Sequence, residues 1–475
     1  MSKRAHPHRV ATLAAAMASA LLLGGCMSLI PAYERPAAPV PTAYAPELAP
    51  AGAAGAAAAD IEWQRYFSDT RLRRLIEISL ANNRDLRVAV LNIEQARAAY
   101  QIKRADELPT VGAGVTAQRQ PGSTGALVNT YAVGLQVTGF ELDFFGRVRS
   151  LSQAALSQYL ASEEARKTVQ ITLIASVANA YVGLLADDEL LRVTRDTLRT
   201  RDESFKLTQL KFDNGAASEL DFRQAEQLLE GARATLAQTQ RQRAQDENAL
   251  VLLLGQALPA DLPAGLALAS QQVVADLPAG VPSELLTRRP DVRAAEQQLL
   301  AANANIGAAR AAFFPRISLT ANAGTASAEL SGLFKSGTWA LTGTASLVQT
   351  IFDSGRNQAN LDVAKVNRDI AVAQYEKAIQ TAFREVSDSL AGRATLGEQL
   401  RAQTALTNAA QISFNLADLR YRNGAASYLD VLDAQRSLFT AQQGLVQVQA
   451  LQAQNLMTLY KVLGGGWTEA PATTN

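Results

Sequence analysis

Histidine, cysteine and methionine are scarce in this sequence of 475 residues. Both histidines, His6 and His8, and the only cysteine, Cys26, lie near the N-terminus, and Met457 is the only methionine beyond Met27. The rest of the chain therefore lacks the imidazole and thiol groups of most metal sites and of much catalysis. Catalysis by carboxylates alone stays open, but an enzyme is not the favoured interpretation, and neither a metal nor a cofactor is expected.

The sequence also has almost no excess of charge of either sign, because 45 Lys and Arg residues are balanced by 44 Asp and Glu residues. A nucleic-acid-binding protein usually carries a clear basic excess or a basic patch. No nucleic-acid partner is therefore expected.

The first 26 residues have the order of an export signal. A basic start is followed by an apolar run over Val10–Leu23 and then by Gly24, Gly25 and Cys26. The run is shorter than the roughly 20 residues that a membrane-spanning helix needs, so we interpret residues 1–25 as a signal peptide. Its end resembles the lipobox of bacterial lipoproteins, which implies a covalent lipid on Cys26 as the membrane anchor. The residue after Cys26 is Met27 rather than Asp, which the resemblance associates with the outer membrane.

Residues 26–59 are rich in proline and alanine. Proline interrupts helices and favours extended backbone, so this stretch predicts an acylated linker that lies along the surface. Its prolines are Pro31, Pro36, Pro39, Pro41, Pro46 and Pro50.

A repeated segment organises the rest of the chain. Ser204–Asp221 and Ser413–Asp430 are identical at eleven of eighteen positions, at a constant offset of 209. Both contain Asn-Gly-Ala-Ala-Ser, in which Asn-Gly can end one helix and Ser can cap the next. The sequence therefore predicts two helical hairpins with similar tips. The tips are Asn214, Gly215, Ala216, Ala217 and Ser218 in the first copy and Asn423, Gly424, Ala425, Ala426 and Ser427 in the second.

Four segments alternate between apolar and small or polar residues, which is typical of strands. We predict them at about 109–119, 131–142, 315–325 and 338–350. Each is long enough for a tilted membrane strand. Four strands cannot close a barrel, and an open edge in lipid would leave backbone groups unpaired, so several copies would have to combine their strands. A soluble sheet with an aromatic core at its base stays open as an alternative.

Two proline-free stretches, Gly146–Phe212 and Gly355–Tyr421, predict helices of about 100 Å. The first carries an apolar residue at every seventh position, which favours coiled-coil packing. These residues are Val177, Leu184, Leu191, Leu198, Phe205 and Phe212.

Three segments resemble the TolC-type outer-membrane factors in their lipoprotein (OprM- or NodT-like) branch: Leu277–Leu319, Tyr428–Gln443 and Tyr460–Trp467. The resemblance implies a mainly α protein with a membrane β-barrel. In such a homotrimer, four strands per chain form a twelve-stranded barrel in outer-membrane lipid, continuous with a periplasmic α-barrel of antiparallel hairpins. The family passively conducts substrates from a periplasmic adaptor and an inner-membrane pump to the exterior.

The predicted organisation is an internal two-fold repeat between a leader and a tail. The divisions are the signal peptide 1–25, the linker 26–59, the first repeat 60–254, an equatorial connection 255–288, the second repeat 289–463 and the tail 464–475.

The resemblance also implies a periplasmic gate beside the second tip. It places Leu429, Asp430 and Asp433 at the constriction, with Arg436 near Asp433 and Tyr421 on the other side of the turn. Asp221 holds the equivalent place in the first copy, next to the apolar Leu220 and Phe222. Spacing alone favours an ordinary exposed pair between Asp433 and Arg436. Both Asn-Gly-Ala-Ala-Ser tips are expected to dock the adaptor.

Two other classes of protein stay open from the residues. A periplasmic adaptor lipoprotein also has a lipid anchor and long hairpins, although it predicts one hairpin and compact β domains. A lipoprotein enzyme acting on envelope polymers would need a compact carboxylate site, which the sequence does not reveal. The cargo, the particular pump and the particular adaptor are not identified.

Overall fold

The computed structural model describes residues 28–45, 57–123, 125–271, 277 and 282–467. Its contacts divide the chain into two compact units. One contains Met1–Ala37, Asn92–Glu163 and Ala294–Glu376, and the other contains Ala38–Leu91, Glu164–Arg293 and Lys377–Asn475. The predicted signal peptide and Cys26 lie outside the described residues.

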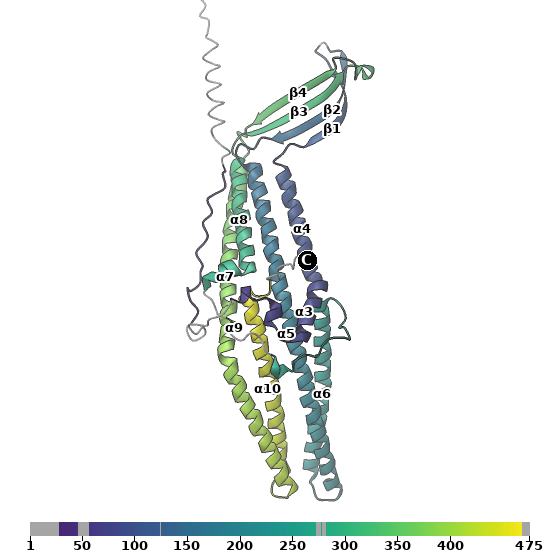
Figure 1. Ribbon diagram of the computed structural model, residues 1–475, viewed down its shortest axis with the longest axis vertical. Helices are drawn as coiled ribbons and strands as arrows, with labels where there is room; N and C mark the ends of the chain where they lie inside the picture. Colours follow the sequence, from purple (N-terminus) through teal and green to yellow (C-terminus); the bar gives the residue numbers. More distant parts are fainter. Residues whose placement is uncertain (1–27, 46–56, 124, 272–276, 278–281, 468–475) are drawn as a thin grey trace, which may run out of the picture. The chain divides into compact units, whose positions relative to one another are not determined.

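The elements follow one another in the order of two repeats (Figure 1). The helices are α2 (Trp63–Tyr66), α3 (Thr70–Asn82), α4 (Arg84–Ala105), α5 (Arg147–Asp213), α6 (Glu219–Leu254), α7 (Pro282–Arg288), α8 (Pro290–Ala311), α9 (Arg356–Arg422) and α10 (Tyr428–Val462). The strands are β1 (Val111–Pro121), β2 (Leu127–Glu141), β3 (Arg316–Ser327) and β4 (Trp339–Val348), and the short 3₁₀ turns are η1 (Ala58–Asp60), η2 (Leu268–Ser270) and η3 (Leu330–Gly332).

The four strands form one antiparallel sheet in the order β1-β2-β3-β4 (Figure 1). β2 begins at Leu127, before the predicted position 131, because Leu127 and Val128 pair with Pro121 and Gln120. The ladder thus continues to the edge of the glycine-containing turn. The four strands and the two long hairpins of the predicted fold class are confirmed.

The two faces of the sheet differ in chemistry. Register places Ala113, Leu135, Ala323 and Leu341 in one row and Gly112, Gln136, Asn322 and Thr342 in the next. Because neighbouring rows point to opposite faces, one face is mainly apolar and the other is mainly polar, with charge on the polar face at Glu141 and Arg316, where β2 ends and β3 begins. Val115 on the apolar face is 76% exposed. A sheet of this kind is suited to lipid on one side and water on the other. The apolar face includes Val111, Val115, Val133, Leu135, Val137, Leu319 and Leu341, and the polar face includes Thr116, Gln118, Gln136, Thr138, Thr320, Asn322, Thr342 and Thr344.

An ion-pair cluster joins the sheet to the helices. The carboxylate of Glu141, at the end of β2, accepts two hydrogen bonds from Arg147 at 2.8 and 2.7 Å. Arg316, at the start of β3, lies 2.6 Å from the same carboxylate. Phe145 stacks on Phe314 beside this cluster, with 4.7 Å between ring centroids. These contacts fix where β2 ends and where β3 and α5 begin.

Residues 29–35, called the N-terminal segment below, lie along α8. Arg310 donates to the carbonyl of Leu29 at 3.2 Å, and Asn303 donates to the carbonyl of Pro31 at 2.8 Å. Gly307 is required between them, since a Cβ there would lie 2.6 Å from Cγ1 of Ile30. Further along, Tyr33 and Arg35 both bind the buried Glu296, at 2.9 and 2.8 Å. α8 thus holds residues 29–35 through side chains along its length.

The two hairpins turn in the same way. The turn glycines Gly215 and Gly424 have φ of +70° and +72°, a conformation that glycine adopts readily. Ala216 N–H donates to the Lys211 carbonyl at 2.7 Å, and Ala425 N–H donates to Arg420 at 2.8 Å. α5 and α9 have 67 residues each, while α6 and α10 return over 36 and 35.

The predicted seven-residue line of α5 is buried only in part. Val177, Leu184 and Leu191 are buried, whereas Leu198 and Phe205 are half-buried and Phe212 is exposed. A second line at the same spacing is buried as far as Thr208, although its residues are polar or charged. It consists of Asp187, Thr194, Arg201 and Thr208. A search of the sequence for apolar residues at every seventh position could find only the first line, because the residues of the second buried line are polar or charged.

Candidate functional site: the hairpin tips

A capping box closes each tip. Ser218 Oγ accepts from Asp221 N–H at 3.1 Å, and the Asp221 carboxylate accepts from the Ser218 hydroxyl at 2.8 Å. Ser427 and Asp430 repeat the arrangement, and the distance from the Ser427 hydroxyl oxygen to the Asp430 carboxylate oxygen is 3.0 Å. The caps satisfy N–H groups that would otherwise be unpaired at the start of α6 and α10. Two of the predicted gate residues, Asp221 and Asp430, therefore also hold the turns in shape.

Asp433 and Arg436 form the only predicted ion pair of the gate, with 3.4 Å between Arg436 Nη1 and Asp433 Oδ1. Their side chains are 65% and 46% exposed. An exposed pair of this length contributes little to stability. Both groups are therefore available for other partners at modest cost.

The first copy lacks this pair. At the offset of 209, Asp433 and Arg436 correspond to Gln224 and Gln227, whereas Leu429 corresponds to Leu220. Both leucines are exposed. Among the predicted gate residues, the difference in charge between the two copies thus lies at Asp433 and Arg436 rather than at Leu429 or Asp430.

Tyr421 connects the two hairpins. Its ring lies 5.3 Å from that of Tyr428, across the second turn. On its other side, Lys211 Nζ of α5 lies 4.1 Å from the ring centroid, which is within range of a cation–π contact. The predicted latching role of Tyr421 stays a prediction, and Lys211 is the neighbour that the sequence did not reveal.

A small apolar cluster lies behind the tips. α6 contributes Ala225 and Leu228, and α10 contributes Tyr428, Val431 and Leu432. Burial raises the pKa of Tyr428, and a side-chain hydrogen bond with Thr208 of α5 opposes that rise. The two hairpins therefore share one core close to their turns. Half-buried members of this cluster are Phe205, Phe414, Ala417 and Tyr421.

Polar contacts continue this interface away from the tips. Gln435 of α10 donates to Ser204 Oγ of α5 at 3.2 Å. Arg201 donates to the Leu228 carbonyl at 3.1 Å, and its guanidinium lies 5.2 Å from the Phe439 ring centroid. Beyond the shared apolar cluster, the contacts described here between the hairpins are therefore one hydrogen bond and one cation–π contact.

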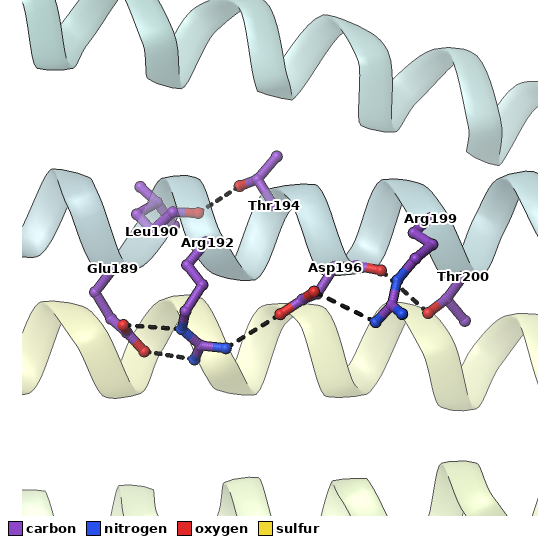
Figure 2. Close-up of polar contacts among 7 residues, drawn as sticks. All are labelled: Glu189, Leu190, Arg192, Thr194, Asp196, Arg199 and Thr200. Carbon is purple, nitrogen blue, oxygen red and sulfur yellow. Dashed lines mark hydrogen bonds and ion pairs between the residues drawn. The ribbon is translucent and has the colours of Figure 1, made fainter.

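A ladder of charged side chains marks a different side of α5 (Figure 2). Arg192 pairs with Glu189 at 2.6 Å and with Asp196 at 3.1 Å, and Asp196 pairs with Arg199 at 3.4 Å. Pairs of this type contribute about 0.3–0.5 kcal/mol each. The ladder is a solvated helix face, in contrast to the buried polar line that contains Arg201.

The fold and the paired tips define a class of protein. A sheet with an apolar and a polar face, combined with two long hairpins, is the subunit of a TolC-type outer-membrane channel. The chain belongs to the outer membrane efflux protein family, whose sequence profile matches residues 75–256 and 281–465.

Named relatives span nearly the whole chain. It is 49% identical over 469 residues to the toluene efflux pump outer membrane protein TtgC of Pseudomonas putida, with 96% of both chains covered. The antibiotic efflux pump outer membrane protein ArpC of Pseudomonas putida matches with the same identity, length and coverage. The open state of the Neisseria gonorrhoeae MtrE outer membrane channel is similar in structure, with a TM-score of 0.85, 43% identity, and coverage of 93% of this chain and 99% of that one.

These findings confirm the predicted family, function and location. The chain is the outer-membrane channel of a tripartite efflux system and extends into the periplasm, and it works with pump partners. Its family consists of efflux channels and is not enzymatic. The two alternatives from the sequence, an adaptor lipoprotein and an envelope enzyme, are wrong.

Proposed function

We propose that three copies of this chain form one channel, which a gate at the second hairpin tips closes on the periplasmic side. Within the described part of the chain, β1 pairs only with β2, and β4 pairs only with β3. Two free strand edges cannot remain in lipid. Pairing β4 of one copy with β1 of the next removes both edges, and three copies give twelve strands, an even number that such barrels permit.

The observation that carries the gate is the asymmetry of the tips. Asp433 and Arg436 are exposed and loosely paired, and the first copy has two neutral glutamines in their place. In a threefold ring, three Asp433 carboxylates would repel one another and favour widening, whereas Arg436 would offset that repulsion. Leu429 and Asp430 complete the proposed constriction, with Tyr421 as its latch. Asp221 contributes from the first copy as a cap.

Opening requires the second hairpin to move against the first. The seam between them contains Lys211 with Tyr421 and Ser204 with Gln435, each joined by one weak contact. The proposed trigger is a periplasmic adaptor that binds the two Asn-Gly-Ala-Ala-Ser tips and links the channel to an inner-membrane pump. Both tips are exposed turns of the same geometry, which would give one adaptor type two similar docking sites.

The proposed cargo is small organic compounds. Relatives of this chain are named for toluene and antibiotic efflux. The polar face of the sheet, which would line the barrel, carries threonine, serine, asparagine, glutamine and small residues. Apart from the paired Glu141 and Arg316 at the base of the sheet, such a lining is uncharged along the described strands and does not select strongly by charge.

The proposed membrane anchor is an acyl chain on Cys26. Leu29 is held by Arg310, six residues before β3 begins at Arg316. Cys26 is three residues from Leu29, and three residues reach at most about 10 Å. The docked segment would therefore keep the anchor near the base of a membrane strand. Labelling with radioactive palmitate tests this: the wild type should incorporate label and Cys26→Ser should not, and equal labelling would contradict the assignment.

Single-channel recording in a planar bilayer tests the gate. Asp433→Ala and Arg436→Ala should each change the conductance or the open probability of the full-length channel. Gln224→Ala and Gln227→Ala, at the equivalent positions of the first copy, are matched controls and should behave as the wild type does. Wild-type recordings from both second-copy variants would contradict the gate assignment.

A further inference from the structure

The buried polar line of α5 is specific to the first repeat. Asp187, Thr194, Arg201 and Thr208 recur every seven residues and are all buried. At the offset of 209, the equivalent residues of α9 are Leu396, Gln403, Ala410 and Ala417. Polar residues at coiled-coil core positions reduce stability and select the register of neighbouring helices. The line therefore points to control of register.

Among the described residues, Arg201 is a buried cation that contacts a carbonyl and a ring instead of a carboxylate. It is 7% exposed, and its Nη1 donates to the Leu228 carbonyl at 3.1 Å while Phe439 lies against the guanidinium. Burial, together with the nearby Arg436, lowers its pKa. Its Nε is buried without a hydrogen-bond partner among the described residues.

On the other hairpin, Gln435 has a buried hydrogen-bond acceptor without a partner among the described residues, whereas Arg201 has a buried donor without one. Gln435 is 6% exposed, and its Nε2 donates to Ser204 Oγ at 3.2 Å. Its Oε1 is buried and has no partner in the described part of the chain. A donor on α5 and an acceptor on α10 are thus both unmatched in one buried seam, and an unmatched buried group is unfavourable.

The two unmatched groups are offset along the helices. Arg201 is level with Phe439, and Ser204 is level with Gln435. Arg201 precedes Ser204 by three residues on α5, so Gln435 would have to move about 4.5 Å along α5, away from the tip, to reach it. Shifts of about one helical turn between packed elements are established switching movements.

We propose that Arg201 and Gln435 are positioning residues of the gate, which select between two registers of the hairpins. In the register described here, Gln435 binds Ser204 and Phe439 covers Arg201. In the second register, Gln435 Oε1 accepts from Arg201 Nε, and this hydrogen bond stabilises the shifted hairpin of the open channel. The inference rests on the proposed function, because it supplies the movement that the gate at Asp433 needs.

The test is a double-mutant cycle on the full-length channel, with open probability and the thermal unfolding midpoint as readouts. Arg201→Met should lower the open probability on the order of tenfold, the effect of one buried hydrogen bond. Gln435→Met should lower it less, because it also removes the bond to Ser204 that stabilises the register described here. The double variant should be no lower than either single variant, since both remove the same bond. The unfolding midpoint should stay the same or rise, because each change removes an unmatched buried group.

Gln403→Met is the matched control. Gln403 donates to the Ala441 carbonyl at 2.9 Å within the second hairpin, and its replacement should leave the open probability unchanged. Additive effects of Arg201→Met and Gln435→Met, or an equal effect of Gln403→Met, would overturn the inference. An unchanged open probability in both single variants would also overturn it. If Asp433→Ala still changes the channel in that case, the gate stands and only the register mechanism fails.

Discussion

Lys211 Nζ lies 4.1 Å from the centroid of the Tyr421 ring, and this contact joins the end of α5 to the end of α9. The two residues belong to different hairpins and lie just before the two turns. A contact here resists separation of the tips, where a small displacement has the largest effect on the opening. It is also weak enough to break without unfolding either helix.

Replacing Lys211 by Met removes the cation but keeps most of the apolar stem. A cation–π contact at a partly exposed site contributes about 1 kcal/mol, so Lys211→Met should raise the open probability about fivefold. Single-channel recording measures this change. Lys206→Met is the control, because Lys206 pairs with Asp202 on the same helix at 2.7 Å. If both variants have the same open probability as the wild type, Lys211 does not contribute to the gate.

The two capping boxes separate a structural role of Asp430 from a gating role. Asp221→Ala and Asp430→Ala each remove the carboxylate half of one capping box, which should cost about 1 kcal/mol of local stability. Hydrogen exchange in the first turns of α6 and α10 should therefore increase equally in the two variants. If Asp430 also lies at the constriction, only Asp430→Ala should change the conductance. A matching conductance change in Asp221→Ala would assign the effect to the caps.

Asp187 predicts a pH dependence of stability. Burial, a hydrogen bond with Asp246, and the charges of Asp246 and Asp188 raise its pKa to about 7, while Arg243 opposes the rise. The folded value is above the ordinary value of 3.8, so the folded protein binds more protons between the two. The free energy of unfolding should therefore increase as pH falls from about 7 toward about 4.

Asp187→Asn should flatten that dependence, which denaturant titrations at several pH values would measure. Asp196→Asn, on the exposed ladder of α5 (Figure 2), is the control and should keep the wild-type slope. An unchanged slope in Asp187→Asn would show that other groups titrate in this range.

Glu296 should make the largest contribution to holding the N-terminal segment against α8. Glu296→Gln weakens the paired contact with Arg35 and the bond from Tyr33. Limited proteolysis should then cut between residues 28 and 37 several times faster than in the wild type. Glu94→Gln, on the exposed surface of α4, should cleave at the wild-type rate. Protection in Glu296→Gln equal to the wild type would assign that contribution to Asn303 and Arg310 instead.

The sequence predicted what depends on local patterns. Asn214 and Ser218 mark the first tip because turn and cap residues act within a few positions of one another. The strands follow from alternation, which is again local. The capping role of Asp430 could also be predicted from the sequence, since Ser427 precedes it at the spacing of a capping box.

Contacts between the hairpins were beyond prediction. Lys211 and Tyr421 are 210 positions apart, and their meeting depends on how two long helices align. Arg201 and Gln435 left one usable signal, the seven-residue spacing of Arg201 with Thr194 and Thr208. That signal was missed because a core position is normally sought among apolar residues, and these are polar.

The central claim is that opening requires the two hairpins to separate at their tips. A bifunctional maleimide that joins Lys211→Cys to Tyr421→Cys in the full-length channel tests it most directly, with each single-cysteine variant as the control. The account predicts that the joined channel stays closed in a planar bilayer, while the same double variant without the reagent opens at least as often as the wild type. Openings of wild-type frequency in the joined channel would contradict it.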